Sequence, residues 1–358
     1  MKAFRNREMK NRRKQKGFSL IELLVAVAIL VIVAGTVIAG MINTTRSEGT
    51  VMNRTQVHAS VRNATELMEQ EIGQAGRLPE VSGLTITFAA ALVANPLGTT
   101  ATPTISSITG LFVGEQITVD PNSTAEETVT ISAIAGSTIT AKFYNAHGTA
   151  AIPVVILGGF ASGIVPPTTA STSGSSMLIF SGSGTTAIAA LTSAQASNAS
   201  TLKLYGDLYG DGNTYYVIYK CTQNANGNGT LYRYVSSGTD INTTAAMQAG
   251  VLLLDNLGQN PGGTPCFTYQ VKEPFVTING GQVQQTFVVN VAVTLTVQTQ
   301  NRDAQTGQFQ TETKALLNIS PRNVFDAWEL ASAPTGYTRA QPMPPNILST
   351  MLTVSTSP

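Results

Sequence analysis

The 358-residue sequence has few charged side chains and very few residues that ligate metals or act as nucleophiles. Charged residues make up 11% of the chain, and it holds only two histidines, His58 and His147, and two cysteines. These four residues lie far apart in the sequence and do not suggest a tetrahedral zinc site. Neither histidine belongs to a motif with a Ser or Cys nucleophile, and no Gly-rich loop of the Walker type is present. We therefore expect a protein that is not an enzyme and has no cofactor, with each histidine at the surface or packed.

Long apolar runs are also scarce, but one stands at residues 18–42. Its 25 residues exceed the roughly 20 that a membrane-spanning helix needs and the about 7–15 of an ordinary secretory signal. Residues 1–17 carry eight basic side chains and one acid, Glu8, which predicts a cytoplasmic N-terminus and an exported remainder. Without this leader the chain has 13 basic and 19 acidic residues, a net charge of −6. A basic, nucleic-acid-binding body is therefore not expected.

One carboxylate, Glu22, lies within the apolar run, where it costs roughly 2.5–3.5 kcal/mol at mid-span and less near an end. The stretch Gly17-Phe-Ser-Leu-Ile-Glu22 resembles the class III signal peptide of type IV prepilins and pseudopilins, whose pattern is Gly-Phe-x-x-x-Glu. The resemblance implies that a prepilin peptidase cleaves between Gly17 and Phe18 and N-methylates Phe18. It also implies that Glu22 pairs with the Phe18 amine of a neighbouring subunit. The alternative is a plain signal anchor that tolerates Glu22 near the interface.

The pattern along the chain predicts an α+β fold that begins with a long helix over residues 18–77, its first part, 18–42, membrane-spanning. Val57, Val61, Met68 and Ile72 recur at helical spacing and should form one face packed on a head. Gly76 and Pro79 indicate the helix end. Residues 82–160 alternate apolar and polar side chains in short runs, which predicts an inserted small β module. Its role is either surface decoration or adhesion and subunit contact.

Three further segments follow the module. Residues 161–176 have the Pro, Ser, Thr and Gly composition of a linker. Residues 177–332 contain strand-like runs and predict a β-rich head, and residues 333–358 suggest a flexible tail. Residues 69–77 and the order of strands in the head resemble PilW-like minor pilins and J-type pseudopilins.

The head offers two candidate sites. Cys221 and Cys266 both follow the span, in a compartment where disulfides persist, so we expect them to pair rather than remain free thiols. The loop 206–213 suggests either a turn or, less strongly, a calcium site built on Asp207, Asp211 and Asn213. Seven tyrosines between residues 205 and 234 indicate core packing or an exposed interface.

The resemblance to prepilins, taken with these features, implies a minor pilin that is held in the bacterial inner membrane with its head outside and then assembled into a type IV pilus. Expected partners are prepilin peptidase, other pilins or pseudopilins and the inner-membrane assembly platform. Three alternatives remain open: a pseudopilin of a type II secretion system, a signal-anchored adhesin that never polymerises, and an exported hydrolase with a site built from scattered residues.

Overall fold

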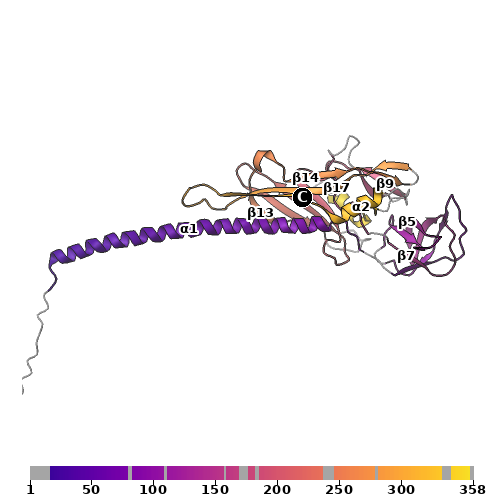
Figure 1. Cartoon of the computed structure of the whole chain (residues 1–358), viewed down its shortest axis with the longest axis horizontal. Helices are drawn as coiled ribbons and strands as arrows, with labels where there is room; N and C mark the ends of the chain where they lie inside the picture. Colours follow the sequence, from indigo (N-terminus) through magenta and orange to yellow (C-terminus); the bar gives the residue numbers. More distant parts are fainter. Residues whose placement is uncertain are drawn as a thin grey trace, which may run out of the picture.

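One long helix projects from a β-rich head (Figure 1), an arrangement that confirms the predicted α+β fold class. The computed structural model describes residues 17–79, 83–108, 111–156, 159–168, 176–181, 185–236, 246–278, 281–332 and 340–354. The predicted leader lies outside the described residues except for Gly17.

Helix α1 (Leu20–Gln74) has 55 residues and is therefore about 80 Å long at 1.5 Å per residue. Along its exposed length, hydroxyl side chains of α1 donate to carbonyls of the preceding turn, as at Thr36, Thr44, Thr45 and Thr55. The chain turns away at Gly76, which has a φ of +85° and whose missing Cβ would lie 2.6 Å from the Ala161 carbonyl oxygen. Only glycine fits this conformation and this close approach.

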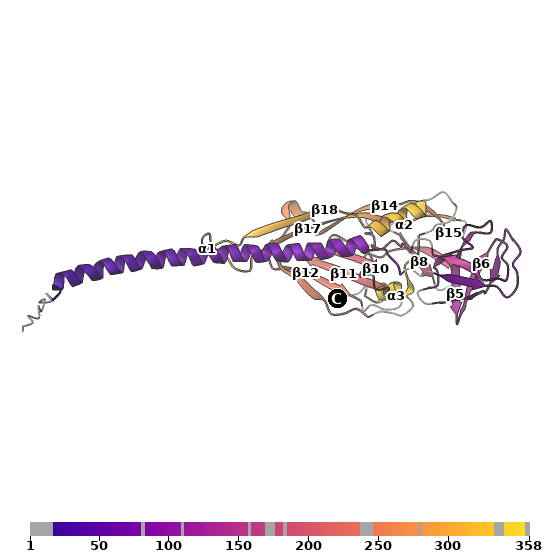
Figure 2. The same ribbon diagram turned by 60° about the horizontal axis from the view of Figure 1, so that its bottom comes forward.

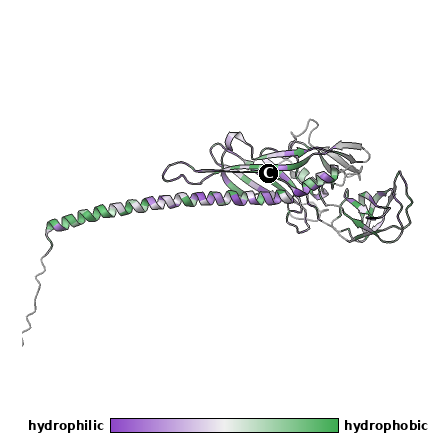
Figure 3. Ribbon diagram, viewed as in Figure 1, coloured by the Kyte–Doolittle hydropathy of each residue, from purple (hydrophilic) through white to green (hydrophobic). Residues whose placement is uncertain are grey.

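The two halves of α1 have different surroundings. The first half is apolar and exposed, as the green ribbon of Figure 3 shows. The second half packs on the head, with Val61, Met68 and Ile72 at most 1% exposed and Val57 in contact with the core. This burial confirms the helical face predicted from their spacing.

A seven-stranded antiparallel sheet follows the helix and has a core of its own, formed by side chains such as Ile86, Ile117, Ile131 and Phe143. Its order is β2-β6-β3-β1-β7-β4-β5, and β5 also pairs with β6, so the sheet closes on itself. Figures 1 and 2 both place this module beyond the C-terminal end of α1, at the opposite end of the molecule from the N-terminal part of α1. The strands are β1 (Leu84–Thr87), β2 (Thr99–Ala101), β3 (Thr104–Ile105), β4 (Gln116–Val119), β5 (Glu127–Ala135), β6 (Thr138–Phe143) and β7 (Ile152–Val155).

The second seven-stranded sheet receives the helix. Its order is β10-β11-β12-β13-β17-β14, and β18 pairs with the other edge of β17. Strand β17 is long enough to pair with β14 near its start and with β13 near its end. The strands are β10 (Thr201–Gly206), β11 (Tyr215–Thr222), β12 (Gly229–Val235), β13 (Val251–Leu257), β14 (Phe267–Lys272), β17 (Phe287–Gln298) and β18 (Thr311–Ile319).

Smaller elements complete the head. Two hairpins pair β8 with β9 and β15 with β16. The β17–β18 hairpin runs beside α1, where His58 Nδ1 lies 2.5 Å from Glu312 Oε1. The remaining elements are β8 (Ser176–Ser181), β9 (Thr185–Ala190), the 3-10 helix η1 (Pro261–Gly263), β15 (Phe275–Ile278), β16 (Gly281–Gln284), α2 (Arg322–Ser332) and α3 (Pro345–Val354).

The expected linker at residues 161–176 is wrong for its first half. Residues 161–167 are buried, and their backbone bonds to β10: Tyr205 N donates to Gly163 O at 2.7 Å and Val165 N to Lys203 O at 3.0 Å. Because these amides and carbonyls find partners, the segment lies inside the head despite its linker-like composition. Residues 169–175 lie outside the described residues.

The expected flexible tail at residues 333–358 is wrong for residues 340–354. Met343, Ile347 and Met351 recur every four residues and are at most 2% exposed on α3 and the segment before it. The Gln341 side chain exchanges two hydrogen bonds of 2.9 Å with the backbone of Gln116, at the start of β4. Apolar burial and this contact fix the C-terminal segment between the module and the head, while residues 333–339 and 355–358 lie outside the described residues.

Candidate functional site

The N-terminal segment joins an extended, exposed peptide to a capped helix. Residues 17–19 precede α1 without helical structure, and Phe18 is 87% exposed. A Cβ added to Gly17 would meet no atom of the described residues within 4 Å. The described fold therefore does not require glycine at this position, and the Gly17-Phe18 bond lies in an exposed segment.

Ser19 and Glu22 begin α1 as a capping box. Glu22 N donates to Ser19 Oγ at 3.4 Å, and Ser19 N donates to Glu22 Oε2 at 3.0 Å. This reciprocal pair satisfies two helix-terminal amides, and the Glu22 charge also complements the positive end of the helix dipole. The carboxylate of Glu22 thus lies within one residue of Phe18, at the start of the apolar helix.

The apolar half of α1 offers a continuous surface to other molecules. Its large side chains are at least 46% exposed from Phe18 to Ile42, and α1 is the one helix among the described residues long and apolar enough to cross a membrane. Apolar area on this scale is not stable in water and requires lipid or other apolar helices around it.

The opposite end of α1 is held to the head by a buried polar network around Glu71. Arg233 of β12 donates from Nε to Glu71 Oε2 at 3.2 Å and makes a second, shorter contact through Nη2. The hydroxyls of Tyr219 and Tyr209 also donate to the Glu71 carboxylate, the latter at 3.2 Å. The side chains of Glu71 and Arg233 are only 3% and 12% exposed.

Electrostatics in this network favour the ion pair. Burial disfavours the charge on Arg233, but its hydrogen bonds with Glu71 and the attraction between them outweigh that effect and raise the Arg233 pKa. Burial, and then the negative charge of Glu71, raise the pKa of Tyr219, so its hydroxyl stays a donor. A buried pair with its remaining donors and acceptors satisfied fixes one geometry between α1 and the sheet.

The helical spacing of apolar residues does not by itself single out Glu71. The available signal was the position of Glu71 beside Ile72 and three residues after Met68, on the face predicted to be buried. The tyrosine cluster supplies both packing and polar contacts: Tyr205, Tyr216 and Tyr219 are fully buried, whereas Tyr209 is 51% exposed.

Cys221 and Cys266 form the predicted disulfide. It joins β11 to the residue before β14, and both residues are at most 3% exposed. The bridge therefore connects distant strands of the sheet that receives α1.

The Asp207 loop is built as a turn. The carboxylate of Asp207 accepts from Asp211 N at 3.1 Å and Gly212 N at 3.3 Å. Asp211 in turn accepts from Asn213 N at 2.9 Å and from the Tyr215 hydroxyl at 2.6 Å, and this last bond lowers the Asp211 pKa. Within the described ranges, no group of three or more His, Cys, Asp or Glu residues could hold a metal ion.

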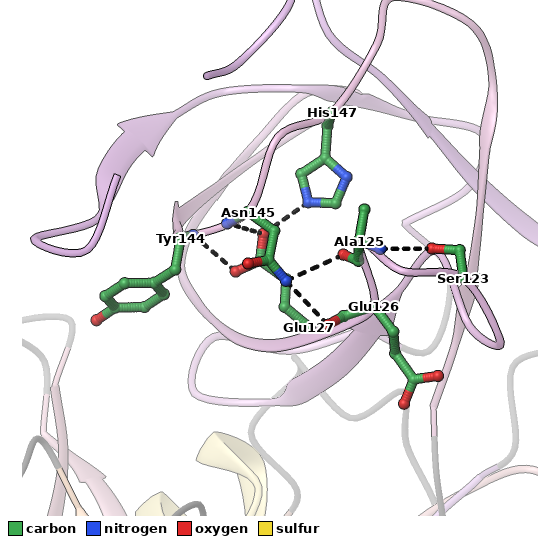
Figure 4. Close-up of polar contacts among 7 residues, drawn as sticks. All are labelled: Ser123, Ala125, Glu126, Glu127, Tyr144, Asn145 and His147. Carbon is green, nitrogen blue, oxygen red and sulfur yellow. Dashed lines mark hydrogen bonds and ion pairs between the residues drawn. The ribbon is translucent and has the colours of Figure 1, made fainter. Parts of the chain in front are cut away.

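A second buried polar pair lies in the module. His147 Nε2 is 2.6 Å from Glu127 Oε1, with side-chain exposures of 0% and 7%. Figure 4 shows that the Glu127 carboxylate also accepts from the backbone amides of Tyr144 and Asn145. The two neighbouring carboxylates act separately, because Glu126 accepts from Asn122 N at 2.7 Å. His147 is thus a packed residue with an ionisable partner that its sequence position did not reveal.

Comparison with known proteins bears on the N-terminal segment alone. A family model for the prokaryotic N-terminal methylation motif matches residues 12–38. No curated protein and no solved structure matches the chain. Together with the apolar helix, the motif fits a type IV prepilin or pseudopilin. The resemblance of the head to PilW-like minor pilins or J-type pseudopilins remains a prediction.

Proposed function

We propose that this protein is a minor pilin, a non-enzymatic subunit of a type IV pilus. The observation that carries the proposal is the methylation motif, whose Gly17-Phe18 bond lies in an exposed, extended segment before a capped apolar helix. Prepilin peptidase would cleave this bond on the cytoplasmic side and methylate the new Phe18 amine.

Assembly would then proceed through α1. Before assembly, residues 18–42 span the inner membrane while the head lies outside. In the filament, the exposed apolar side chains of several such helices pack together in place of lipid. Glu22 pairs with the Phe18 amine of a neighbouring subunit, because two ionised groups in a dry bundle are tolerable only when they neutralise each other.

The head supports a minor rather than a major subunit. It carries a module with a separate core beyond the end of α1, which adds surface that packing of the helices does not need. Its expected partners are other pilins and the inner-membrane assembly platform, and nucleic acid is not among them.

We also propose that the subunit has no resident cofactor, since the carboxylates of the Asp207 loop close their own turn. Thermal unfolding of the full chain should have the same midpoint in calcium and in chelator. A midpoint that rises with calcium concentration would contradict this proposal.

The experiment that tests the proposed function is the intact mass and N-terminal residue of the membrane-extracted protein, from cells with and without prepilin peptidase. We expect a chain that begins at methylated Phe18 only when the peptidase is present. A chain that still begins at Met1 in both cells would favour a signal-anchored adhesin.

A pseudopilin would give the same N-terminus, so a second measurement separates the two filaments. Deletion of the gene should reduce the number of surface pili and leave type II secretion unchanged. The opposite result would assign the protein to a secretion pseudopilus.

A further inference from the structure

The module carries an exposed apolar loop between β1 and β2. Residues 88–97 read Phe-Ala-Ala-Ala-Leu-Val-Ala-Asn-Pro-Leu, and the sequence contains no charged residue or histidine from Val81 to Gly114. Within the loop, Val93 is 81% exposed and Leu97 80% exposed. Among the described residues after α1, these are the most exposed large apolar side chains.

The backbone of this loop is tied down, so its apolar side chains are displayed rather than free to collapse. Leu92 exchanges backbone hydrogen bonds of 2.8 and 3.1 Å with His147, and Asn95 N donates to Tyr144 O at 2.9 Å. A turn closes the tip, with Gly98 N bonded to Asn95 O at 2.8 Å and Leu97 N to Asn95 Oδ1 at 3.0 Å.

The segment that holds the loop is the one that Figure 4 shows around His147. The His147 ring stacks on Phe88, with ring centroids 5.6 Å apart, and its Nε2 bonds to Glu127. The buried His147–Glu127 pair therefore fixes the strand-like segment on which Leu92 and Asn95 are anchored. Pre-ordering of this kind removes the entropy cost that a mobile loop has on binding.

The flanks of the loop have the chemistry of a membrane interface. A Cβ at Gly98 would lie 2.5 Å from Lys142 Cε and 2.8 Å from a ring carbon of Tyr144, so both side chains adjoin the turn. The Lys142 ammonium lies 5.6 Å from the centre of the Tyr144 ring. An apolar tip bordered by an amphipathic ring and a long basic side chain is typical of segments that sit at the headgroup level.

We propose that residues 88–97 insert Val93 and Leu97 into the surface of a lipid bilayer other than the one that α1 crosses. The module lies beyond the C-terminal end of α1, at the opposite end of the molecule from the N-terminal part of α1 (Figures 1 and 2), so the loop lies far from the membrane that anchors the chain. Two large side chains offer far less area than the roughly 800 Å² per partner of a stable protein interface. Lipid needs no matching surface, and this uncharged loop has no charge to desolvate.

The test uses the full chain in nanodiscs, so that α1 is already occupied by lipid, mixed with protein-free phosphatidylcholine vesicles and separated by flotation. We expect the wild type to float with the vesicles and a Val93→Ser, Leu97→Ser variant to do so about tenfold less, since apolar burial drives the association. The matched control is Val251→Ser, Leu252→Ser, whose side chains are 53% and 47% exposed on β13. It should float as the wild type does.

Equal flotation of the wild type and the loop variant would overturn the proposal, as would absence of flotation by the wild type. Cross-linking of heads through the loop without vesicle binding would instead assign the loop to self-association and also overturn it. Circular dichroism and the Cys221–Cys266 bridge report that each variant is folded. The assay requires neither cleavage nor assembly, so its failure is independent of the proposed pilin function.

Discussion

Glu71, three residues before the end of α1, forms a buried ion pair with Arg233 in the middle of β12, with Arg233 Nε 3.2 Å from Glu71 Oε2. Among the described ion pairs, it is the one that joins α1 to the sheet that receives it with both side chains buried. Because α1 is the element that would pack into a filament, this pair connects the assembling part of the molecule to the head.

Loss of the Glu71 charge should weaken the contact between helix and head. Glu71→Gln leaves Arg233 buried without its counter-charge, so we expect a loss of about 3–5 kcal/mol in the free energy of unfolding. Denaturant unfolding of the detergent-solubilised chain measures it. The control is Glu66→Gln, which removes an exposed ion pair with Arg62 on the same helix and should cost less than about 1 kcal/mol. Equal losses in the two variants would contradict the role of burial.

Gly17 should matter for cleavage and not for folding. Gly17→Ala adds a methyl group where the described structure offers no contact, so the precursor should fold normally but remain uncleaved by prepilin peptidase. Intact mass measures cleavage. Gly49→Ala, equally free of contacts within α1, is the control and should be cleaved at the wild-type rate. Normal cleavage of Gly17→Ala would remove Gly17 from the recognised motif.

Glu22 should act after cleavage. Glu22→Ala leaves the Gly17-Phe18 bond intact but removes the carboxylate that would pair with a neighbouring Phe18 amine. We expect largely normal processing and strongly reduced incorporation into filaments, measured by the amount of subunit in sheared filament fractions. Glu48→Ala, on the exposed part of α1, should assemble normally. Undiminished incorporation of Glu22→Ala would disprove the pairing.

The disulfide should contribute substantially to the stability of the head. Cys221 and Cys266 are 45 residues apart, for which the chain-entropy model gives about 4 kcal/mol. A Cys221→Ser, Cys266→Ser double variant should therefore lose about 2–5 kcal/mol in the free energy of unfolding, which is the usual cost of removing a native disulfide. Thiol labelling of the exported wild-type chain checks the bridge itself. Two labelled thiols without reductant would show that it does not form.

Glu115 should make the fold less stable as pH rises. It is 2% exposed, and burial raises its pKa from 4.5 to about 8, although the Phe112 amide opposes the shift. Between these pH values the folded state holds a proton that the unfolded state has released, so stability falls as pH rises through this window. The contribution of Glu115 to stability should be constant below the window.

The test compares urea unfolding at pH 5 and pH 8 for the wild type and Glu115→Gln. The amide removes this titration, so the variant should lose less stability between the two pH values and be the more stable protein at pH 8. Burial lowers the pKa of Lys203 from 10.5 to about 8, so the titration of Lys203 changes stability with pH only above that window. Parallel pH profiles for wild type and variant would exclude Glu115 as the cause, and Glu126→Gln is the exposed control.

Local patterns predicted the elements whose physics is local. The spacing of Val57, Val61, Met68 and Ile72 predicted a buried helical face, since a helix repeats every 3.6 residues. The disulfide was predicted because both cysteines follow the membrane span, in a compartment where disulfides persist, and because the chain has only these two. The prediction of a flexible tail was wrong for residues 340–354. Pro, Ser and Thr dominate the composition of residues 333–358, although Met343, Ile347 and Met351 have the spacing of a buried helical face.

The sequence by itself determined the N-terminal segment of this protein, residues 1–42. The basic leader, Gly17, Phe18, Glu22 and the apolar run that follows act through their immediate neighbours and through a bilayer, and none of these depends on how the head folds. Tertiary structure alone decided which polar residues are buried together. Glu71 and Arg233 are 162 residues apart, and Glu127 and His147 are 20 apart. A residue's charge is readable from the sequence, whereas its partner and its solvent exposure arise only when distant segments pack.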